Sequence, residues 1–293
     1  MKREEFSPSS EGVRRGLAII TGAGTGMGFE EAKAVAGKRF HTIMACHHPD
    51  KAEEKRQEII QETGNEHVEV MGLDLADLSS VRRFADEIKA RFEHLDLLMN
   101  NAGTLETGLH KTVDNLERTV QVNYVGPFLL TRLMLPLMGE GSRIVNMVSL
   151  TYKYGSLDFP DFFTRGRKGS FWRIPIYSNS KLALTLFTLN LAERLKDKGI
   201  TVNASDPWIV STNIIRMHNF IDPLTDIFFR PFIRTPRQGA DTAIHLLLDE
   251  DKASQTGTIN RSNRIIDVGD KYLHHKQMQE LWDRTEDIVK KFL

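Results

Sequence analysis

Short apolar runs alternate with helical patterns through residues 17–205, and this alternation constrains the fold more than any other feature. The strand candidates are Leu17–Thr21, His41–Cys46, His67–Gly72, Leu95–Asn100, Arg143–Val148 and Thr201–Ser205. The helical patterns are Gly26–Lys38, Pro49–Glu62, Ser79–Phe92, Thr112–Met138 (with a break near Asn123) and Ile176–Lys198. Strands that alternate with helices join through right-handed crossovers into a parallel sheet. The sequence therefore predicts an α/β fold with a doubly wound sheet of about seven strands, covered by helices on both faces.

Length and composition narrow the class of protein. We expect one Rossmann-type domain over residues 1–293, preceded by a polar tail at residues 1–14. The 39 basic and 39 acidic residues balance, so nothing indicates nucleic-acid binding. The single cysteine, Cys46, excludes an internal disulfide and fits a reducing compartment. No apolar stretch has the length of a signal peptide or membrane anchor, so we expect a cytoplasmic protein.

A glycine-rich turn follows the first predicted strand and opens the first predicted helix. Its glycines are Gly22, Gly24, Gly26 and Gly28. Glycines let a backbone approach a pyrophosphate closely, and the helix start presents N–H groups to the anion. The turn predicts a dinucleotide site, and the alternative is a glycine-rich turn without a ligand.

The end of the second strand bears on which dinucleotide binds. A carboxylate there would accept hydrogen bonds from a free ribose 2′-hydroxyl and repel a 2′-phosphate. His47 and His48 occupy this place, and the first acid is Asp50, so NADP(H) is favoured and NAD(H) remains an alternative. The two histidines could also be plain surface residues. We expect no metal site, because neither this pair nor 274–275 has suitable partner ligands.

Asp74 follows the third strand and has two interpretations. It could accept a hydrogen bond from the adenine amino group of a bound dinucleotide. Equally, it could be the turn or N-cap acid of the next helix.

Two irregular segments, 150–175 and 213–236, leave the carboxyl ends of strands, where open α/β sheets bind ligands. They are predicted substrate-side loops, with ordinary surface loops as the alternative. Their aromatic residues favour an apolar pocket wall or a surface that touches a membrane, and we prefer the pocket wall. These residues are Phe159, Phe162, Phe163, Phe171, Trp172, Phe220, Phe228, Phe229 and Phe232.

Tyr177 and Lys181 stand four residues apart on one face of the last predicted helix. An ammonium close to a phenol favours the phenolate, so we expect Lys181 to lower the pKa of Tyr177. Such a phenol could exchange protons near neutral pH. The same spacing recurs at Tyr272 and Lys276, which we interpret as surface helix residues because they lack catalytic company upstream.

Taken together, the motifs from Leu17 to Leu248 resemble the short-chain dehydrogenase/reductase family. They are Thr21–Gly28, Asp74–Leu75, Asn100–Gly103, Asn123, Ser149, Tyr177 with Lys181, and Pro207 with Thr212. The stretch between Ser149 and Tyr177, with Ser180–Ala183 and Arg234–Pro236, is similar to the retinol dehydrogenase-related branch.

The resemblance implies a role for each matching position. It implies a catalytic tetrad of Asn123, Ser149, Tyr177 and Lys181, in which Asn123 holds a water near Lys181. The implied cofactor-binding residues are Gly22, Gly24, Thr25, Gly26, Met27, Gly28, His47, Asp74, Leu75, Asn101, Ala102, Gly103, Tyr177, Lys181, Pro207, Ile209 and Thr212. It also implies a homo-oligomer, commonly formed through the helices at 123–138 and 176–198.

The chain departs from the family pattern at four positions. Gly24 stands where the branch often has Asn, and His47 replaces the Arg usual in NADP(H)-using relatives. Val148 replaces the first Ser of a Ser-Ser pair, and Trp208 replaces the Gly of the usual Pro-Gly. The last change brings an indole toward the nicotinamide and could reshape or partly block the substrate side.

These observations support a hypothesis of reversible hydride transfer between NADP(H) and an apolar alcohol, aldehyde or ketone, with Tyr177 as acid and base. The alternative is a catalytically weak NAD(P)-binding sensor or scaffold, which Trp208 motivates. A third alternative is an enzyme that contacts a membrane peripherally through residues 220–233.

Overall fold

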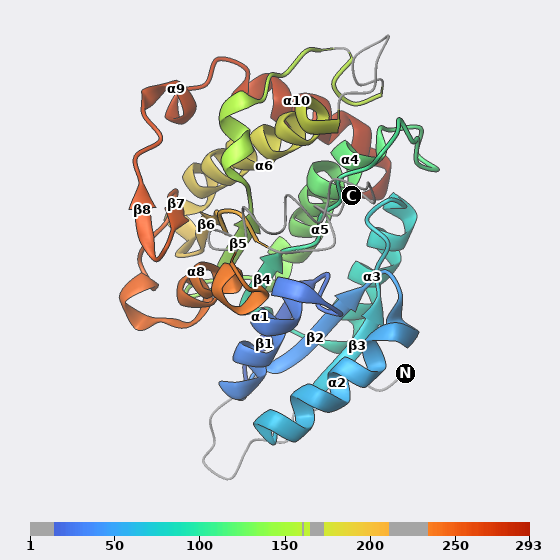
Figure 1. The fold of residues 1–293 in the computed structure, drawn as a ribbon, viewed down its shortest axis with the longest axis vertical. Coiled ribbons are helices and arrows are strands. Elements are labelled where there is room, and N and C mark those ends of the chain that lie inside the picture. The colour runs from blue at the N-terminus through green and yellow to red at the C-terminus, as the bar shows by residue number, and fades with distance from the viewer. Residues whose placement is uncertain (1–14, 160, 165–172, 211–233) are drawn as a thin grey trace, which may run out of the picture.

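The computed structural model describes residues 15–159, 161–164, 173–210 and 234–293. Its centre is an eight-stranded sheet in the order β3-β2-β1-β4-β5-β6-β7-β8, which Figure 1 shows running from blue β3 to orange-red β8. The strands are β1 Leu17–Thr21, β2 His41–Cys46, β3 Val68–Gly72, β4 Leu97–Asn100, β5 Arg143–Met147, β6 Thr201–Ser205, β7 Ile259–Arg261 and β8 Arg264–Ile266. All neighbours are parallel except the antiparallel pair β7 and β8. The predicted doubly wound α/β class is confirmed, with one strand more than expected.

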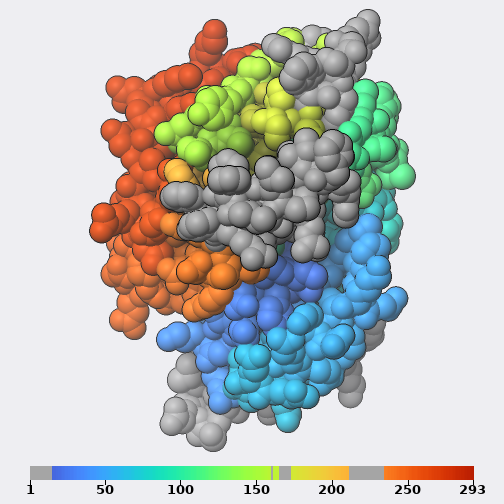
Figure 2. Space-filling model, viewed as in Figure 1, coloured from blue at the N-terminus to red at the C-terminus, as the bar shows by residue number. Residues whose placement is uncertain are grey.

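Helices cover both faces of the sheet. They are α1 Gly26–Gly37, α2 Pro49–Thr63, α3 Leu78–Arg91, α4 Arg118–Val120, α5 Gly126–Met134, α6 Arg173–Leu195, α8 Pro236–Leu248, α9 Asp270–Leu273 and α10 Met278–Val289. Shorter turns of helix are η1 Gln121–Val125, η2 Leu135–Leu137, η3 Leu150–Tyr154, η4 Lys196–Lys198, η6 Glu250–Lys252 and η7 Lys290–Phe292. One apolar core lies under α1, α2 and α8, and the other under α3, α5, α6 and α10. In the space-filling view the orange residues of α8 lie against the blue residues around α1 (Figure 2).

The strand residues alternate between these two cores, which explains why apolar residues follow one another directly within a strand. Ile19 faces one core and Ile20 the other, and Ile43 and Met44 repeat the alternation in β2. Every residue of β1 and β2 is buried. Because both faces are covered, apolar residues dominate these strands, and their sequences lack the regular hydrophobic-polar alternation of a half-exposed strand.

The helix predicted at 112–138 begins later than expected. The N–H of Thr112 donates to the carbonyl of Leu116, and α4 begins only after Glu117, whose carboxylate accepts the N–H of Val120. The predicted break near Asn123 is present as η1, a single turn of π-helix. Such turns insert one residue into an α-helix and often accompany functional sites.

Aromatic residues of the first irregular segment lie in the core, contrary to their predicted role as a pocket wall. Phe162 and Phe163 are buried, and the ring of Phe162 packs 6.2 Å from that of Tyr124. Phe159 packs against both and lies under the guanidinium of Arg284. The predicted aromatic residues Phe171, Trp172, Phe220, Phe228, Phe229 and Phe232 lie outside the described residues, as does the tail at 1–14.

The sheet is extended by a carboxyl-terminal hairpin that the strand pattern did not predict. Strand β7 pairs with β6 through Ala204 and Ile259, and β8 folds back on β7 through Ser262 and Asn263. Both turn residues have positive φ, 52° and 61°, which suits a tight hairpin. Among the described residues, no helix has the length and apolar character needed to span a bilayer.

Candidate active site

The side chains of Ser149 and Tyr177 meet at the carboxyl edge of the sheet. Ser149 follows β5 and caps η3, where its hydroxyl accepts from the N–H and hydroxyl of Thr151. Tyr177 lies in the first turns of α6, and a hydrogen bond joins its phenol to the Ser149 hydroxyl. The two groups from separate elements therefore form one polar unit.

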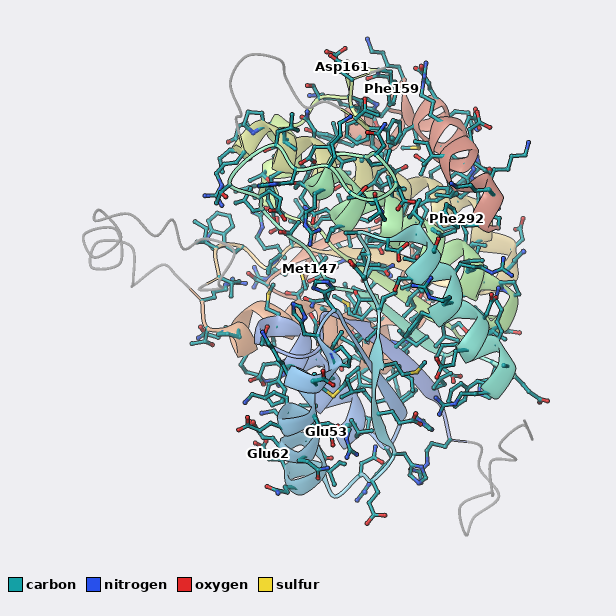
Figure 3. All side chains as sticks on the ribbon, turned by 90° about the vertical axis from the view of Figure 1, so that its right-hand side faces the viewer. Glu53, Glu62, Met147, Phe159, Asp161 and Phe292 are labelled. Atoms are coloured by element: carbon teal, nitrogen blue, oxygen red, sulfur yellow. The ribbon has the colours of Figure 1, made fainter. Side chains whose placement is uncertain are left out.

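Lys181 lies one turn after Tyr177 and is buried. Its ammonium donates to the carbonyl of Met147 at 2.7 Å, and it lies 5.6 Å from the centroid of the Tyr177 ring. Figure 3 shows Met147, the last residue of β5, near the middle of the molecule between Glu53 of α2 and Phe159. The lysine is thus anchored to the sheet beneath the tyrosine.

The pKa values of this pair contradict the expectation that Lys181 makes the Tyr177 proton labile. Burial raises the pKa of Tyr177 to about 12, while the hydrogen bond with Ser149 acts in the opposite direction. Burial also lowers the pKa of Lys181 to about 8, although the carboxylate of Asp206 opposes this shift. The prediction was wrong because removing both groups from water disfavours both charged forms. Without a bound cofactor the phenol is a proton donor.

Asn123 is fixed by a network inside the π-turn. Its amide nitrogen donates to the Thr104 carbonyl at 2.9 Å and to the Ser180 hydroxyl at 3.0 Å. Its amide oxygen accepts the N–H of Thr104 at 2.7 Å. A Cβ added at Gly103 would lie 3.3 Å from this oxygen and 3.6 Å from the Lys181 nitrogen. Asn123 and Lys181 therefore border the same small space without touching, and the predicted bridging water stays a prediction.

A cleft of about 520 Å³ lies over the glycine-rich turn, at the amino end of α1. Gly22 and Gly26 have φ values of 68° and 60°, which favour glycine. At Gly28 an added Cβ would lie 2.4 Å from the Gly22 carbonyl oxygen, so no side chain fits there. The site's residues fit a dinucleotide: the turn brings backbone next to an open cleft and directs a helix start toward it.

The far wall of the cleft is bound to the turn through Thr21. The Thr21 hydroxyl accepts the N–H groups of Asn101 and Ala102, both at 3.0 Å. The Asn101 amide donates in return to the Thr21 carbonyl at 2.9 Å. This arrangement holds the ends of β1 and β4 together on either side of the ligand position.

A second cavity of about 340 Å³ adjoins the cleft and contains the Ser149–Tyr177 unit. Met27, Asn101 and Gly103 line both spaces, so the two are continuous. Most remaining wall residues are apolar: Leu105, Met147, Val148, Ile174, Pro207, Trp208, Ile209 and Val210. An apolar molecule in this cavity could present an oxygen to Ser149 and Tyr177 next to whatever occupies the cleft.

Comparisons with known proteins agree with this geometry. Residues 16–162 match the family described as short chain dehydrogenase. Retinol dehydrogenase 11 from Mus musculus is 38% identical over 276 residues, which cover 93% of this chain and 86% of that protein. Retinol dehydrogenase 12 from Homo sapiens is 35% identical over 275 residues, with coverage of 93% and 86%.

The chain belongs to the short-chain dehydrogenase family. It is therefore an NAD(P)-dependent oxidoreductase, as the resemblance implied. A crystal structure of an uncharacterized protein from Mycobacterium Paratuberculosis is 28% identical, with a TM-score of 0.73 and coverage of 95% and 94%. A short chain dehydrogenase from Burkholderia cenocepacia J2315, solved with NADP, has the same fold at 24% identity, a TM-score of 0.65 and coverage of 84% and 95%.

In this short-chain dehydrogenase the adenosine end of the cleft is formed by His47 and Asp74. The His47 Nε2 lies 3.4 Å from one Asp74 oxygen, and the other oxygen accepts the N–H of Ala76 at 2.8 Å. Asp74 is thus a turn acid that also lines the cleft, while Asp77 caps α3. Both interpretations of Asp74 remain compatible with the structure.

Beneath the phosphate turn lies Cys46, the only cysteine. Its sulfur would lie 3.5 Å from a Cβ added at Gly24, and Ala52 would lie at 3.3 Å. Burial raises the pKa of the Cys46 thiol to about 11. Gly24, where the branch often has Asn, therefore packs closely over the end of β2.

Trp208 stands in an unusual conformation at the mouth of the apolar cavity. Its φ is 66°, a region that bulky residues rarely adopt. The Asp206 carboxylate accepts the Trp208 N–H at 3.0 Å, and the Arg261 guanidinium lies 4.6 Å from the indole centroid. Trp208 is 40% exposed and forms part of the wall of the cavity of about 340 Å³.

An ion pair stabilises this conformation. The Asp206 side chain is fully buried and accepts from Arg261 at 2.6 and 3.1 Å. Arg234 adds a bond to the Pro207 carbonyl at 3.4 Å. Sequence patterns gave no signal for these partners, because Arg261 comes from a strand that the pattern missed.

Most predicted cofactor-binding residues line the cleft or the adjoining cavity. The cleft is lined by Gly22, Thr25, Gly26, Met27, His47, Asp74, Leu75, Asn101, Ala102 and Gly103. The cavity is lined by Tyr177, Lys181, Pro207 and Ile209. Gly24 and Gly28 support the turn from below, and Thr212 lies outside the described residues. Sequence reasoning did not single out Arg118, which lines the cleft, or Arg173, which lines the cavity.

Proposed function

We propose that this short-chain dehydrogenase transfers hydride reversibly between NADP(H) and an apolar alcohol, aldehyde or ketone. One observation carries the proposal: the hydrogen-bonded Ser149–Tyr177 unit stands in an apolar cavity that is continuous with the dinucleotide cleft. Retinol dehydrogenases among the relatives support an apolar substrate.

The protein residues supply proton transfer and orientation. The bound nicotinamide would supply or accept the hydride. In reduction Tyr177 donates its proton to the carbonyl oxygen, and Ser149 donates a hydrogen bond that stabilises the developing charge. Because its phenol is protonated at neutral pH, Tyr177 begins this direction in the correct state. In oxidation the phenolate is required, so this direction starts from the less populated form of Tyr177.

A Tyr177→Phe variant tests this role. A positioned acid or base contributes about 10²–10⁴-fold, so turnover should fall at least about 100-fold, measured through the absorbance of reduced nicotinamide. The variant loses only one hydroxyl, so NADPH binding should remain. Near-normal turnover would refute the assignment of Tyr177.

The preference for NADP(H) is a separate part of the proposal. No carboxylate follows β2 directly, and His47 lines the cleft there. At position 47 there is no acid that would repel a 2′-phosphate of the cofactor. There is also no guanidinium that would bind it strongly, and His47 is a weaker phosphate ligand. Fluorescence titration should give tighter binding of NADPH than of NADH. The His47→Ala variant should weaken the binding of NADPH more than the binding of NADH. Equal effects on both cofactors would contradict the preference.

A sensor or scaffold is the second candidate, because the bulky Trp208 lines the substrate side. NADPH binding without turnover of any aromatic aldehyde or long-chain alcohol would favour it. Cytoplasmic location and homo-oligomer formation stay predictions. Trp282 of α10 packs on Phe128 and Phe187, so these parts of the expected oligomer helices are covered by the chain itself.

A further inference from the structure

Arg173 introduces a permanent positive charge into the apolar cavity. Its guanidinium borders the same space as Tyr177, and one terminal nitrogen donates to the Leu105 carbonyl at 3.0 Å. Its Nε is buried and has no hydrogen-bond partner among the residues that the structure describes. No ion pair of Arg173 occurs within the described parts of the chain.

A half-buried guanidinium whose Nε is buried, in an apolar cavity and without an anion among the described residues, calls for an explanation. The group has five N–H donors, remains charged at every physiological pH, and matches the geometry of a carboxylate. Leaving a charged donor unsatisfied costs more than leaving a neutral one. Arg261, which packs on the indole of Trp208, shows the usual solution, because buried Asp206 neutralises it. Arg173 lacks such a carboxylate, and an incoming ligand could supply it.

The position of Arg173 limits the size of that ligand. Arg173 and Tyr177 are four residues apart in α6, so their side chains leave the same face of the helix. The cavity that both line measures about 340 Å³, which suits a compact molecule. A ligand that contacts both must carry its anion and its reacting oxygen at opposite ends of a short apolar body.

We propose that the substrate of this enzyme is a compact apolar carbonyl or alcohol compound that also carries a carboxylate, which Arg173 binds while the reacting oxygen faces Tyr177 and Ser149. The inference rests on the proposed oxidoreductase function and adds the anionic group. Trp208 and Ile174 would contact the apolar body between the two polar ends.

A structural role for Arg173 is the competing explanation, since its bond to Leu105 tethers the loop after β4. The two explanations differ in one measurable respect. Loss of a tether would impair acidic and neutral substrates alike, whereas loss of an anion site impairs only the acidic ones.

The test compares 4-carboxybenzaldehyde with its methyl ester, which lacks the negative charge and is larger by one methyl group. The wild-type enzyme with NADPH should prefer the acid by about 10- to 100-fold in kcat/KM, as expected for a charge-assisted bidentate contact. Arg173→Gln should abolish this preference by lowering kcat/KM for the acid far more than for the ester, and Arg173→Lys should keep part of the preference. The matched control Arg264→Gln removes a charge from the exposed end of β8 and should leave the preference unchanged.

Calorimetric titration of the NADP⁺-saturated protein with 4-carboxybenzaldehyde gives a second readout that needs no turnover. Binding that weakens about 10-fold or more in Arg173→Gln supports the anion site. Turnover of the ester without preference for the acid overturns the anion site and leaves the oxidoreductase function standing. If neither compound is reduced, acid binding that depends on Arg173 still supports the site while the proposed function loses support. Acid binding that is absent, or equal in wild type and Arg173→Gln, overturns the inference.

Discussion

The cofactor cleft and the substrate cavity adjoin, yet different forces shape them. In the cleft, backbone groups and glycines set the geometry, as at Gly28, where an added Cβ would meet the Gly22 carbonyl. In the cavity, side chains from distant segments set it: Asp206 after β6, Arg261 in β7 and the strained Trp208 between them. A surface built from backbone suits a ligand that is the same throughout a family. A surface built from side chains can change with the substrate.

The largest effect should follow from breaking the ion pair on the cavity side. Arg261→Leu would leave the fully buried Asp206 carboxylate unpaired and should lower the free energy of unfolding by about 3–5 kcal/mol in urea denaturation. Arg264→Leu, in the neighbouring exposed strand β8, should change the free energy of unfolding by less than about 0.5 kcal/mol. The double variant Asp206→Asn/Arg261→Leu should recover most of the loss. An unchanged single variant would show that the pair does not stabilise this region.

On the cleft side, a buried carboxyl group should make the free energy of unfolding depend on pH. Glu31 of α1 is buried, neither carboxylate oxygen has a hydrogen-bond partner in the described parts of the chain, and burial raises the pKa of Glu31 to about 8. Because the folded pKa exceeds the unfolded one, the protein should lose stability as pH rises from the unfolded pKa toward 8. The loss between pH 5 and pH 8 should be roughly 3 kcal/mol. Glu31→Gln should remove this dependence, as measured by denaturation at the two pH values, and parallel curves for both proteins would contradict it.

The next largest effect should come from adding a single methyl group in the glycine-rich turn of the cleft. Gly28→Ala places a Cβ against the Gly22 carbonyl oxygen and should cost about 1–3 kcal/mol while abolishing NADPH binding. Gly37→Ala, whose Cβ would meet only the Thr63 methyl at 3.9 Å, is the matched control within α1. NADPH affinity should survive in the control. Retained affinity in Gly28→Ala would show that the turn is not the phosphate site.

The smallest effect should come from relieving strain at the cavity mouth. Trp208→Gly removes a bulky residue from positive φ and should change stability by about 1 kcal/mol or less, since lost contact with Arg261 opposes the relief. The same change should lower KM for bulky ketones, with NADPH affinity unaltered. Identical substrate profiles in both proteins would remove Trp208 from the cavity wall.

The same contrast explains what the sequence could predict. Strands β1, β2 and β6 were predicted with their observed bounds, because each is a short β-rich run between helical patterns and is buried along its whole length. The glycine turn was recognisable because close backbone approach excludes side chains locally. The predicted tetrad meets at one edge of the sheet, and its catalytic roles stay predictions.

The features that the sequence did not predict depend on contacts between distant segments of the chain. Strands β7 and β8 have three residues each, too few for a periodic pattern. Tyr272 is buried against Tyr152, and α9 ends before Lys276, so the interpretation of this pair as surface helix residues was wrong. The direction of the Tyr177 pKa shift also required knowledge of burial, which spacing along a helix does not contain.

The single thiol under the phosphate turn is a built-in chemical probe of this region. A maleimide can reach Cys46 only when the segment above it lifts, so the alkylation rate counts openings of that segment without any introduced probe. A bound nucleotide would slow the alkylation of Cys46. The ratio of the two rates would measure how strongly the ligand suppresses opening of the turn.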